Sequence, residues 1–323
     1  MEHWPARTTA RIRALIESLG LPETGIALDF GCGNGVFTEV LVKALPGWKV
    51  FGTDLSIIAV QHAEIRVPSC SFFVAARASE MKEQFDLVFS HHVLEHVQDV
   101  NEAVDEIVAY LKPGGFAFTV LPCGNNGSFE RSICALRSDG TDAAMGNRFF
   151  YEDPGHLRRL TSTDLVQVFR DRGFLLTSEF YSNHRLGALE WLTESAAPLT
   201  IFRLTGTERA VTASAAKRLR ALRASLLLMW ALRFPACRVH TFIERPRRTF
   251  AHVFVFLSCL PLLPFSEPID RYIRKKAEHE WQTRKSEPAG SIMYLFFQRA
   301  HDVPPSLSPS APSPVQGSLS NPA

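Results

Sequence analysis

Residues 29–35 read Asp29-Phe30-Gly31-Cys32-Gly33-Asn34-Gly35, and this stretch decides the fold. It follows the apolar run Gly25–Leu28 and precedes Val36–Leu45, whose apolar residues have helical spacing. Glycine lacks a Cβ, so it adopts positive φ angles and lets another molecule approach the backbone closely. The stretch therefore predicts a strand, a tight turn and a helix N-terminus, whose free N–H groups favour electron-rich ligand atoms.

A second acidic residue follows at a distance that suits a ribose contact. Asp54 lies nineteen residues past Gly35, after the apolar run Lys49–Thr53. A carboxylate in this position can accept hydrogen bonds from both hydroxyls of a ribose. The glycine spacing is G-x-G-x-G, however, whereas the dinucleotide fingerprint requires G-x-G-x-x-G. The sequence thus favours a nucleoside site and argues against an NAD-binding dehydrogenase.

Three further segments stand in the order and spacing of a known family: Phe85-Asp86-Leu87-Val88, Val93-Leu94-Glu95-His96-Val97 and Leu111-Lys112-Pro113-Gly114-Gly115. With the glycine stretch, they resemble the class I S-adenosylmethionine-dependent methyltransferases over about residues 25–121. The resemblance implies an α/β fold, a Rossmann-like doubly wound sheet of seven strands whose last strand is antiparallel. It also implies S-adenosyl-L-methionine as cofactor, in a site formed by Asp29, Gly31, Cys32, Gly33, Gly35, Asp54, Leu55, Ser90 and His91.

Strands alternate with helices along the first half of the chain, which favours a parallel sheet covered on both faces. The pattern predicts helices over residues 8–19, 56–66, 100–111 and 161–172, and further strands over 71–75, 85–90, 116–121, 174–181 and 291–299. The family often carries an acidic residue after the third strand, near the adenine. This chain has Ala76-Arg77-Ala78 there, so the adenine contact stays open.

Histidines are the candidates for the chemical step. If the acceptor is a hydroxyl, a base must take its proton, and histidine is suited to that at neutral pH. Four histidines are candidates: His91 and His92 at the end of the fourth strand, His96 in the Leu-Glu-His run, and His156 in the aromatic loop 149–159 that is expected to form a lid or substrate wall. One of His91 and His92 is expected to line the cofactor pocket, and His96 and His156 are the two proposed as the base. His96 could instead only support its loop. No metal is expected, because Glu95 beside His91 and His92 is an incomplete ligand set.

About 110 residues separate the sixth strand from the last one and do not belong to the common core. The expected organisation is a methyltransferase core over 1–185, a helical insertion over 186–287, the last strand within 288–300 and a disordered Pro/Ser-rich tail over 301–323. Residues 201–250 carry a net charge of +9, which leaves −7 for the rest of the chain. Such asymmetry indicates an acidic partner surface.

The apolar runs of the insertion, 226–232 and 250–265, are shorter than the roughly 20 residues of a membrane span, so an integral membrane protein is not expected. Two interpretations of the insertion stay open. One is a helical subdomain with an ordinary buried seam. The other is an interfacial element with apolar side chains in lipid and arginines on anionic headgroups.

The six cysteines are scattered without a C-x-x-C pair, and Met1–Arg13 lacks the apolar core of a signal peptide. A cytoplasmic protein is expected, with peripheral membrane binding as an open alternative. No nucleic acid is expected, because the arginines alternate with Leu and Phe runs rather than with stacking platforms. The expected activity is methyl transfer to a small-molecule or lipid-linked acceptor, through an oxygen. The alternative is a catalytically silent module that binds a nucleoside or a partner.

Overall fold

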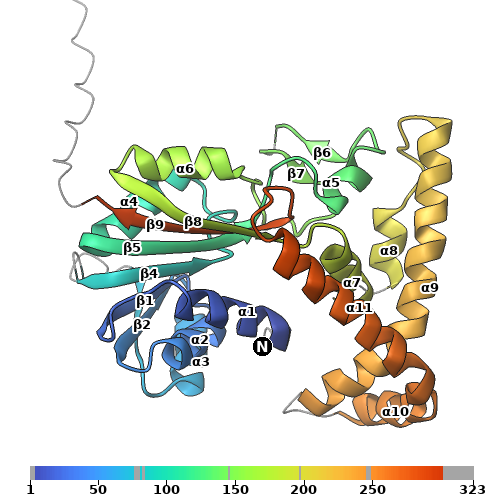
Figure 1. Cartoon of the computed structure of the whole chain (residues 1–323), viewed down its shortest axis with the longest axis horizontal. Coiled ribbons are helices and arrows are strands. Elements are labelled where there is room, and N and C mark those ends of the chain that lie inside the picture. Colours follow the sequence, from blue (N-terminus) through green and yellow to red (C-terminus); the bar gives the residue numbers. More distant parts are fainter. Residues whose placement is uncertain are drawn as a thin grey trace, which may run out of the picture.

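The computed structural model describes residues 4–75, 81, 84–144, 146–195, 198–244 and 249–300. A sheet with helices on both faces forms one part of the molecule, and a group of helices forms the other (Figure 1). The sequence expectations for residues 76–78 and 301–323, and the arginines at 245, 247 and 248, lie outside the described residues.

The sheet has seven strands in the order β3-β2-β1-β4-β5-β9-β8. β9 runs antiparallel to both of its neighbours, whereas the pairs among the first five strands are parallel. This is the Rossmann-like arrangement that the sequence predicts, and the antiparallel last strand is confirmed. The strands are β1 Gly25–Phe30, β2 Trp48–Asp54, β3 Ser71–Val74, β4 Phe85–His91, β5 Leu111–Pro122, β8 Phe174–Ser182 and β9 Ile292–Arg299.

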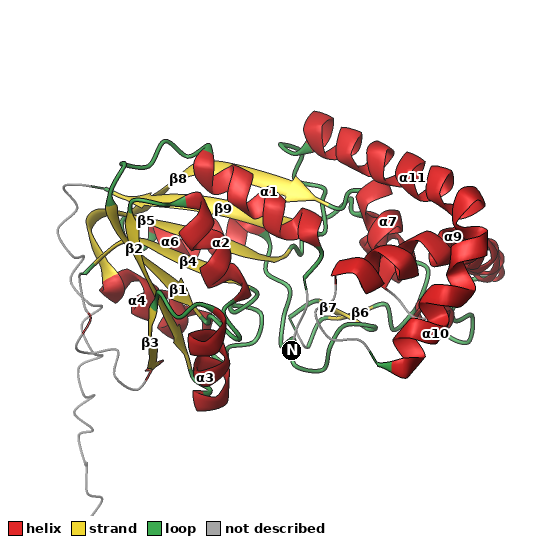
Figure 2. Cartoon of the chain, turned by 90° about the horizontal axis from the view of Figure 1, so that it is seen from below, coloured by secondary structure: helices red, strands yellow, loops and turns green. Residues whose placement is uncertain are grey.

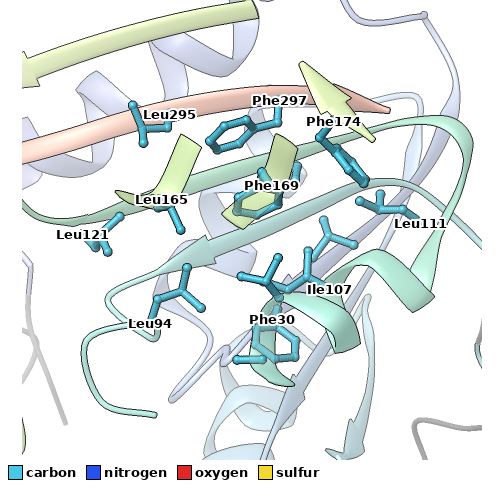
Figure 3. Close-up of a cluster of buried hydrophobic side chains, with 14 of the residues drawn as sticks. Phe30, Leu94, Ile107, Leu111, Leu121, Leu165, Phe169, Phe174, Leu295 and Phe297 are labelled. Carbon is cyan, nitrogen blue, oxygen red and sulfur yellow. The ribbon is translucent and has the colours of Figure 1, made fainter. Parts of the chain in front are cut away.

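Helices cover both faces of this sheet (Figure 2). They are α1 Ala6–Glu17, α2 Val36–Ala44, α3 Ile57–Arg66, α4 Val100–Tyr110 and α6 Ser162–Arg170. Apolar residues of α4 and α6 form the core on one face, where Phe169 stacks on Phe297 with 4.1 Å between ring centroids (Figure 3). Ile12, Leu15 and Ile16 of α1 pack with α2 on the other face.

Local capping explains where these helices begin. The hydroxyl of Ser56 accepts a hydrogen bond from the amide of Ala59 and caps α3, as predicted. Thr161 caps α6 in a reciprocal box with Asp164. Such caps satisfy amide groups that the first helical turn leaves without a partner.

A long connection joins β5 to α6 and contains α5 Phe129–Cys134 and the short strands β6 Thr141–Asp142 and β7 Arg148–Phe149. The buried guanidinium of Arg159 holds the end of this connection, since it pairs with Glu152 and donates to the carbonyls of Cys123 and Ser291. The aromatic loop is therefore fixed against the carboxyl end of the sheet.

The helical region lies between β8 and β9 in the chain, as predicted. Its helices are α7 Leu186–Ser195, α8 Pro198–Leu204, α9 Ala213–Glu244, α10 Phe250–Cys259, the short 3₁₀ helix η2 Leu260–Leu262 and α11 Leu263–Arg284. α11 runs beside α9 back toward the sheet, and α10 lies at the far end of this pair (Figure 1). A buried polar cluster ties the helices together, because the fully buried Arg233 of α9 bonds Asp270 of α11 and the carbonyl of Glu190 in α7.

The helices of the insertion are longer than the apolar runs from which the sequence predicts no membrane span. The apolar runs continue into α9, of 32 residues, and into the helical stretch Phe250–Arg284, of 35 residues, which consists of α10, η2 and α11. Both are long and apolar enough to cross a bilayer by length and composition alone, a criterion that core helices of soluble proteins also meet. The two differ in burial, since 33% of the most apolar stretch of α9 is buried against only 11% in the second helix.

Candidate active site

The glycine loop is held rigidly at the carboxyl ends of β1 and β2. Gly31, Gly33 and Gly35 have φ angles of 74°, 52° and 78°, which disfavour residues with a Cβ. The amide of Gly33 donates to Oδ2 of Asp54 at 2.9 Å, and the amide of Gly31 donates to the carbonyl of Thr53 at 2.8 Å. The end of β2 therefore fixes the loop, and the Asp54 carboxylate keeps further lone pairs for a ligand.

A cavity of about 480 Å³ opens above this loop. Its size lies within the usual range for small-molecule sites. A Cβ built on Gly33 would meet no atom within 4 Å, so any side chain there would project into open space. Of the residues that the resemblance assigns to the cofactor, Gly31, Cys32, Gly33, Asp54, Leu55 and His91 line this cavity.

Three residues of that assignment, Asp29, Gly35 and Ser90, do not line the cavity. Asp29 is buried, and its carboxylate accepts a hydrogen bond of 2.6 Å from the hydroxyl of Thr38. Gly35 is the N-cap of α2, and Ser90 is buried within β4. The structure therefore places all three behind the cavity wall, where they support the loop and the strand ends.

Burial dominates the electrostatics of Asp29. It raises the pKa of this carboxyl to about 7, although the hydrogen bond from Thr38 acts in the opposite direction. A fully buried carboxylate without a cationic partner is disfavoured by desolvation. Asp29 therefore titrates close to neutral pH.

The charges of the cavity suit a cationic ligand. Its wall includes the carboxyl-bearing residues Asp54, Glu106 and Asp153, and no Lys or Arg among the described lining residues. A dinucleotide would bring a pyrophosphate, which needs positive partners, whereas a sulfonium and an ammonium group suit this wall. Apolar contact is available from Trp4 and Phe37. The residues present thus fit S-adenosylmethionine better than NAD.

A second cavity of about 320 Å³ adjoins the first. Five residues line both: Trp4, His91, His92, Asp153 and His156. Further walls come from α1, from β5 and β9, from α5 and the aromatic loop, and from the helical region, which contributes Trp191 and Glu194 of α7. A molecule bound in this second cavity would face the first across the shared residues.

The histidines at the shared wall have different environments. His91 is buried and stacks on Phe37 with 3.7 Å between ring centroids. Burial, reinforced by the charge of His92, lowers the pKa of His91 well below its usual value, so its ring is neutral. Nδ1 of His96 lies 2.9 Å from the carbonyl oxygen of Gly155, and its ring contacts that of His156 with 4.7 Å between centroids. The structure thus brings together the two histidines that the sequence proposes as bases.

The structure shows the surroundings of His92, one of the four candidate histidines, and adds Glu95 and Trp4 to the site. His92 has a φ angle of 54°, and its Nδ1 lies 2.7 Å from Oε1 of the buried Glu95. Burial alone would raise the pKa of Glu95, yet the neighbouring His92 holds it below its ordinary value. Trp4 reaches the cavities from the segment before α1, and no motif marks it. The spacing of His92 and Glu95 was visible, but their meeting with His156 depends on the fold of the long connection.

Residues 3–179, more than half of the chain, match the methyltransferase domain family. A trans-aconitate 2-methyltransferase from Variovorax paradoxus is 31% identical over 41% of this chain and 51% of its own length. A ubiquinone biosynthesis O-methyltransferase from Brucella ovis is 34% identical over 28% of this chain and 38% of its own length. The alignments thus cover about half, or less, of the length of each of these curated relatives.

A solved S-adenosylmethionine-dependent methyltransferase from Mesorhizobium loti is also similar to this chain. It is 18% identical, with a TM-score of 0.39 over 52% of this chain and 82% of its own.

Proposed function

Because the chain belongs to the class I S-adenosylmethionine-dependent methyltransferases, we propose that it methylates an oxygen of a small or lipid-linked molecule. One observation carries the proposal. The donor cavity and the second cavity share Trp4, His91, His92, Asp153 and His156, so that ligands in the two cavities would meet across these residues.

In the donor cavity, the chain supplies a fixed loop and a negative wall. Bound S-adenosylmethionine supplies a methyl group that its sulfonium has already activated. Asp54 would accept the ribose hydroxyls while it holds Gly33 in place, and the carboxylates of the wall would favour the cationic end of the donor. Asp29 does not line the cavity and supports the loop from behind through its hydrogen bond with Thr38. Orientation of donor and acceptor is the main source of rate in such a site.

In the second cavity, aromatic and polar residues converge. Trp4, Tyr151, Trp191 and Tyr294 offer apolar area for a ring or chain. Arg7 and Arg11 also line this cavity, but Arg7 pairs with Glu190, while Arg11 lies over the ring of Trp281 and near Glu278. The cavity therefore suits an acceptor with an apolar body and few polar groups. An oxygen acceptor agrees with the printed name of the Brucella ovis relative.

Proton removal stays a prediction for His96 or His156. Both rings lie at the meeting point of the cavities, and His156 lines both of them. A base in this position would take the hydroxyl proton as the oxygen attacks the methyl carbon, and the carbon–sulfur bond electrons would remain on sulfur.

We further propose that α10 brings the protein to a membrane surface on its cytoplasmic side. Only Cys259 of α10 is buried, whereas Phe250 and Phe254 of α10 are 87% and 64% exposed and Phe265, at the start of α11, is 76% exposed. Exposed apolar groups of this size mark a partner or lipid surface. The basic segment 201–250 lies next to them in the chain, which favours anionic lipid over another apolar surface.

Peripheral docking fits the helices better than a span. Arg233 in α9 and Asp270 in α11 form a buried ion pair, and charged residues continue through α11. Charges are costly at the centre of a bilayer. Part of the basic character is also internal, because Arg233 is fully buried and is not available to lipid.

The decisive experiment supplies the purified chain with donor that carries a labelled methyl group and with lipid and small-molecule extracts. Label in one class of molecule, together with S-adenosylhomocysteine, supports the proposal. Label in lipid extracts alone supports the lipid-linked acceptor. Donor binding without any turnover in all extracts would instead support a catalytically silent nucleoside-binding module.

A further inference from the structure

Three potential metal ligands meet at the wall between the two cavities. They are His92 and Glu95, three residues apart after β4, and His156 from the aromatic loop. Their nearest ligand atoms all lie within 4.8 Å of one another. Ligands at about 2.0–2.2 Å from one ion stand roughly 3–4 Å apart, so small side-chain movements would complete a site.

Glu95 is the strongest sign that this cluster serves a ligand. Its side chain has no exposed surface, and its Oε2 has no hydrogen-bond partner among the described residues. Nδ1 of His156 also lacks a hydrogen-bond partner among the described residues, although it lies 3.7 Å from Oε2 of Glu152, an ion-pair distance. Buried polar atoms are nearly always paired, and a bound ion is one recognised explanation for an exception.

Backbone conformation gives a second, independent sign. His92 adopts a φ angle of 54°, a conformation that is uncommon outside glycine and concentrates at functional sites. This conformation directs its ring toward Glu95, with 2.7 Å between Nδ1 and Oε1. The amide of Leu157 donates to the carbonyl of Glu95 at 2.8 Å, which holds the loop of His156 against the same residue.

We propose that His92, Glu95 and His156 bind a divalent transition-metal ion of the zinc class, with open coordination positions toward the second cavity. Two imidazoles and one carboxylate form a donor set that zinc and similar ions use in catalytic sites. The chain would retain coordination positions for water or an acceptor oxygen, since His92 and His156 line both cavities.

The role of this ion rests on the proposed methyl transfer. An acceptor hydroxyl that coordinates the ion has a lowered pKa and so releases its proton more readily to a neighbouring base. Its oxygen then forms the bond to the methyl carbon while the carbon–sulfur bond breaks and sulfur keeps the electron pair. In this arrangement the lone pair of His156 is used for the metal, which leaves His96 as the candidate base. The sequence predicts no metal because only His91, His92 and Glu95 are close together along the chain. His156 joins His92 and Glu95 only through the fold.

Metal binding is tested directly on the full chain, without turnover. Zn²⁺ is titrated by calorimetry after removal of bound metal, and Co²⁺ is added as a spectroscopic substitute. We expect one ion per chain and the visible absorption of a nitrogen- and oxygen-ligated Co²⁺ site. Glu95→Gln and His156→Asn should each weaken binding by more than the roughly 10–100-fold typical of losing a partner of a metal ligand.

His62→Asn is the matched control, because His62 is an exposed histidine on α3 away from the cluster. It should bind the ion as the unaltered chain does. Absence of stoichiometric binding in the unaltered chain would overturn the proposal. Equal weakening in the His62 variant, or no weakening in the Glu95 variant, would overturn it as well.

A parallel measurement distinguishes failure of the proposed metal site from failure of the proposed methyl transfer. Donor binding and turnover are measured in parallel with and without added Zn²⁺. Stoichiometric metal binding without methylation would sustain the site and reject the proposed function. Methylation that neither needs nor responds to the ion, in a chain that binds none, would reject the site alone.

Discussion

The backbone amide of Gly33 donates a hydrogen bond of 2.9 Å to Oδ2 of Asp54. One carboxylate therefore both shapes the glycine loop and borders the donor cavity. Because of this double role, substitution of Gly33 or Asp54 tests whether the donor binds at this loop.

Gly33→Val should abolish donor binding while the chain stays folded, because the new side chain would project into the cavity. Gly20→Val is the matched control. Gly20 has a φ angle of 64° and, like Gly33, open space at its Cβ, but it does not line the donor cavity. Calorimetric titration with donor should show binding only in the control.

Asp54→Ala should weaken donor binding by about 10–100-fold, since it removes hydrogen bonds to a charged acceptor. Circular dichroism should show an intact fold. Unchanged donor affinity in both Gly33→Val and Asp54→Ala would remove the site from this loop.

Asp29 predicts a pH dependence of stability. Its pKa is raised to about 7 in the folded chain, against 3.8 for an ordinary aspartate. Between these values the folded chain binds more protons than the unfolded chain, so the free energy of unfolding falls as pH rises through this window. The contribution is at most about 4 kcal/mol, at roughly 1.4 kcal/mol per pKa unit.

Asp29→Asn removes this ionisation while it keeps an oxygen for Thr38. In urea unfolding without donor, we expect the variant to gain stability relative to the unaltered chain as pH rises from about 4 to 7. A constant difference across that range would contradict the raised pKa of Asp29.

The histidines at the meeting point of the cavities predict a split between binding and turnover. If one of them removes the acceptor proton, its alanine variant should lose about 10²–10⁴-fold in kcat with donor affinity unchanged. His96→Ala and His156→Ala are compared by single-turnover kinetics with labelled donor. Normal rates in both variants would leave orientation as the source of catalysis.

The buried ion pair of the helical region predicts a large effect on stability. Arg233 and Asp270 are both buried, with 2.6 Å between Nη2 and Oδ1. Asp270→Ala leaves a buried guanidinium without its main partner, which should cost about 3–5 kcal/mol. Arg271→Ala, which breaks an exposed pair with Glu267 on the same helix, should cost no more than about 1 kcal/mol. Urea unfolding measures the free energy of unfolding of both variants. Equal losses of stability would show that the buried pair stabilises the fold no more than the exposed one.

The sheet could be predicted from sequence because its signals are local. Ser56 and Thr161 mark helix starts by their own hydroxyls, and the glycine loop requires positive φ angles wherever it occurs. The last strand was identified because the family resemblance implies one and 291–299 is an apolar run that fits it, although about 110 residues separate it from the sixth strand. The strand limits differ from the expectation, since β5 begins at Leu111 rather than at Phe116.

The site beyond the glycine loop could be predicted only in part. Gly33 and Asp54 were identified because Gly33 lies in the turn after one strand and Asp54 lies at the end of the next strand, with one helix between them. The contact between Glu95 and the loop of His156 depends on a long connection whose path has no periodic signal. In the same way, the net charge of 201–250 includes Arg233 as an unpaired basic residue, whereas its partner Asp270 lies 37 residues away in the chain, in a helix that contacts α9.

The membrane proposal gives the last prediction. α10 and the start of α11 expose Phe250, Phe254, Leu257 and Phe265, and a basic segment precedes them. Anionic lipid attracts each nearby Lys or Arg by about 1 kcal/mol, and salt screens this attraction. The purified chain should therefore float with phosphatidylglycerol vesicles more than with phosphatidylcholine vesicles, and less so at high salt. Leu257→Ser with Phe265→Ser should reduce flotation, because each removes apolar area that would enter the lipid surface.

Ile65→Ser is the control for that experiment, since Ile65 is an equally exposed apolar residue on α3 of the core. It should leave flotation and donor binding unchanged. Washing the vesicles with alkaline carbonate distinguishes a chain that is bound at the surface from one that spans the bilayer. Docking through α10 predicts that carbonate releases the chain, whereas retention would indicate that α9 or the stretch Phe250–Arg284 spans the bilayer. If the chain ignores anionic vesicles at low salt, α10 does not contact lipid. The acceptor is then expected to be a soluble molecule that reaches the second cavity from water.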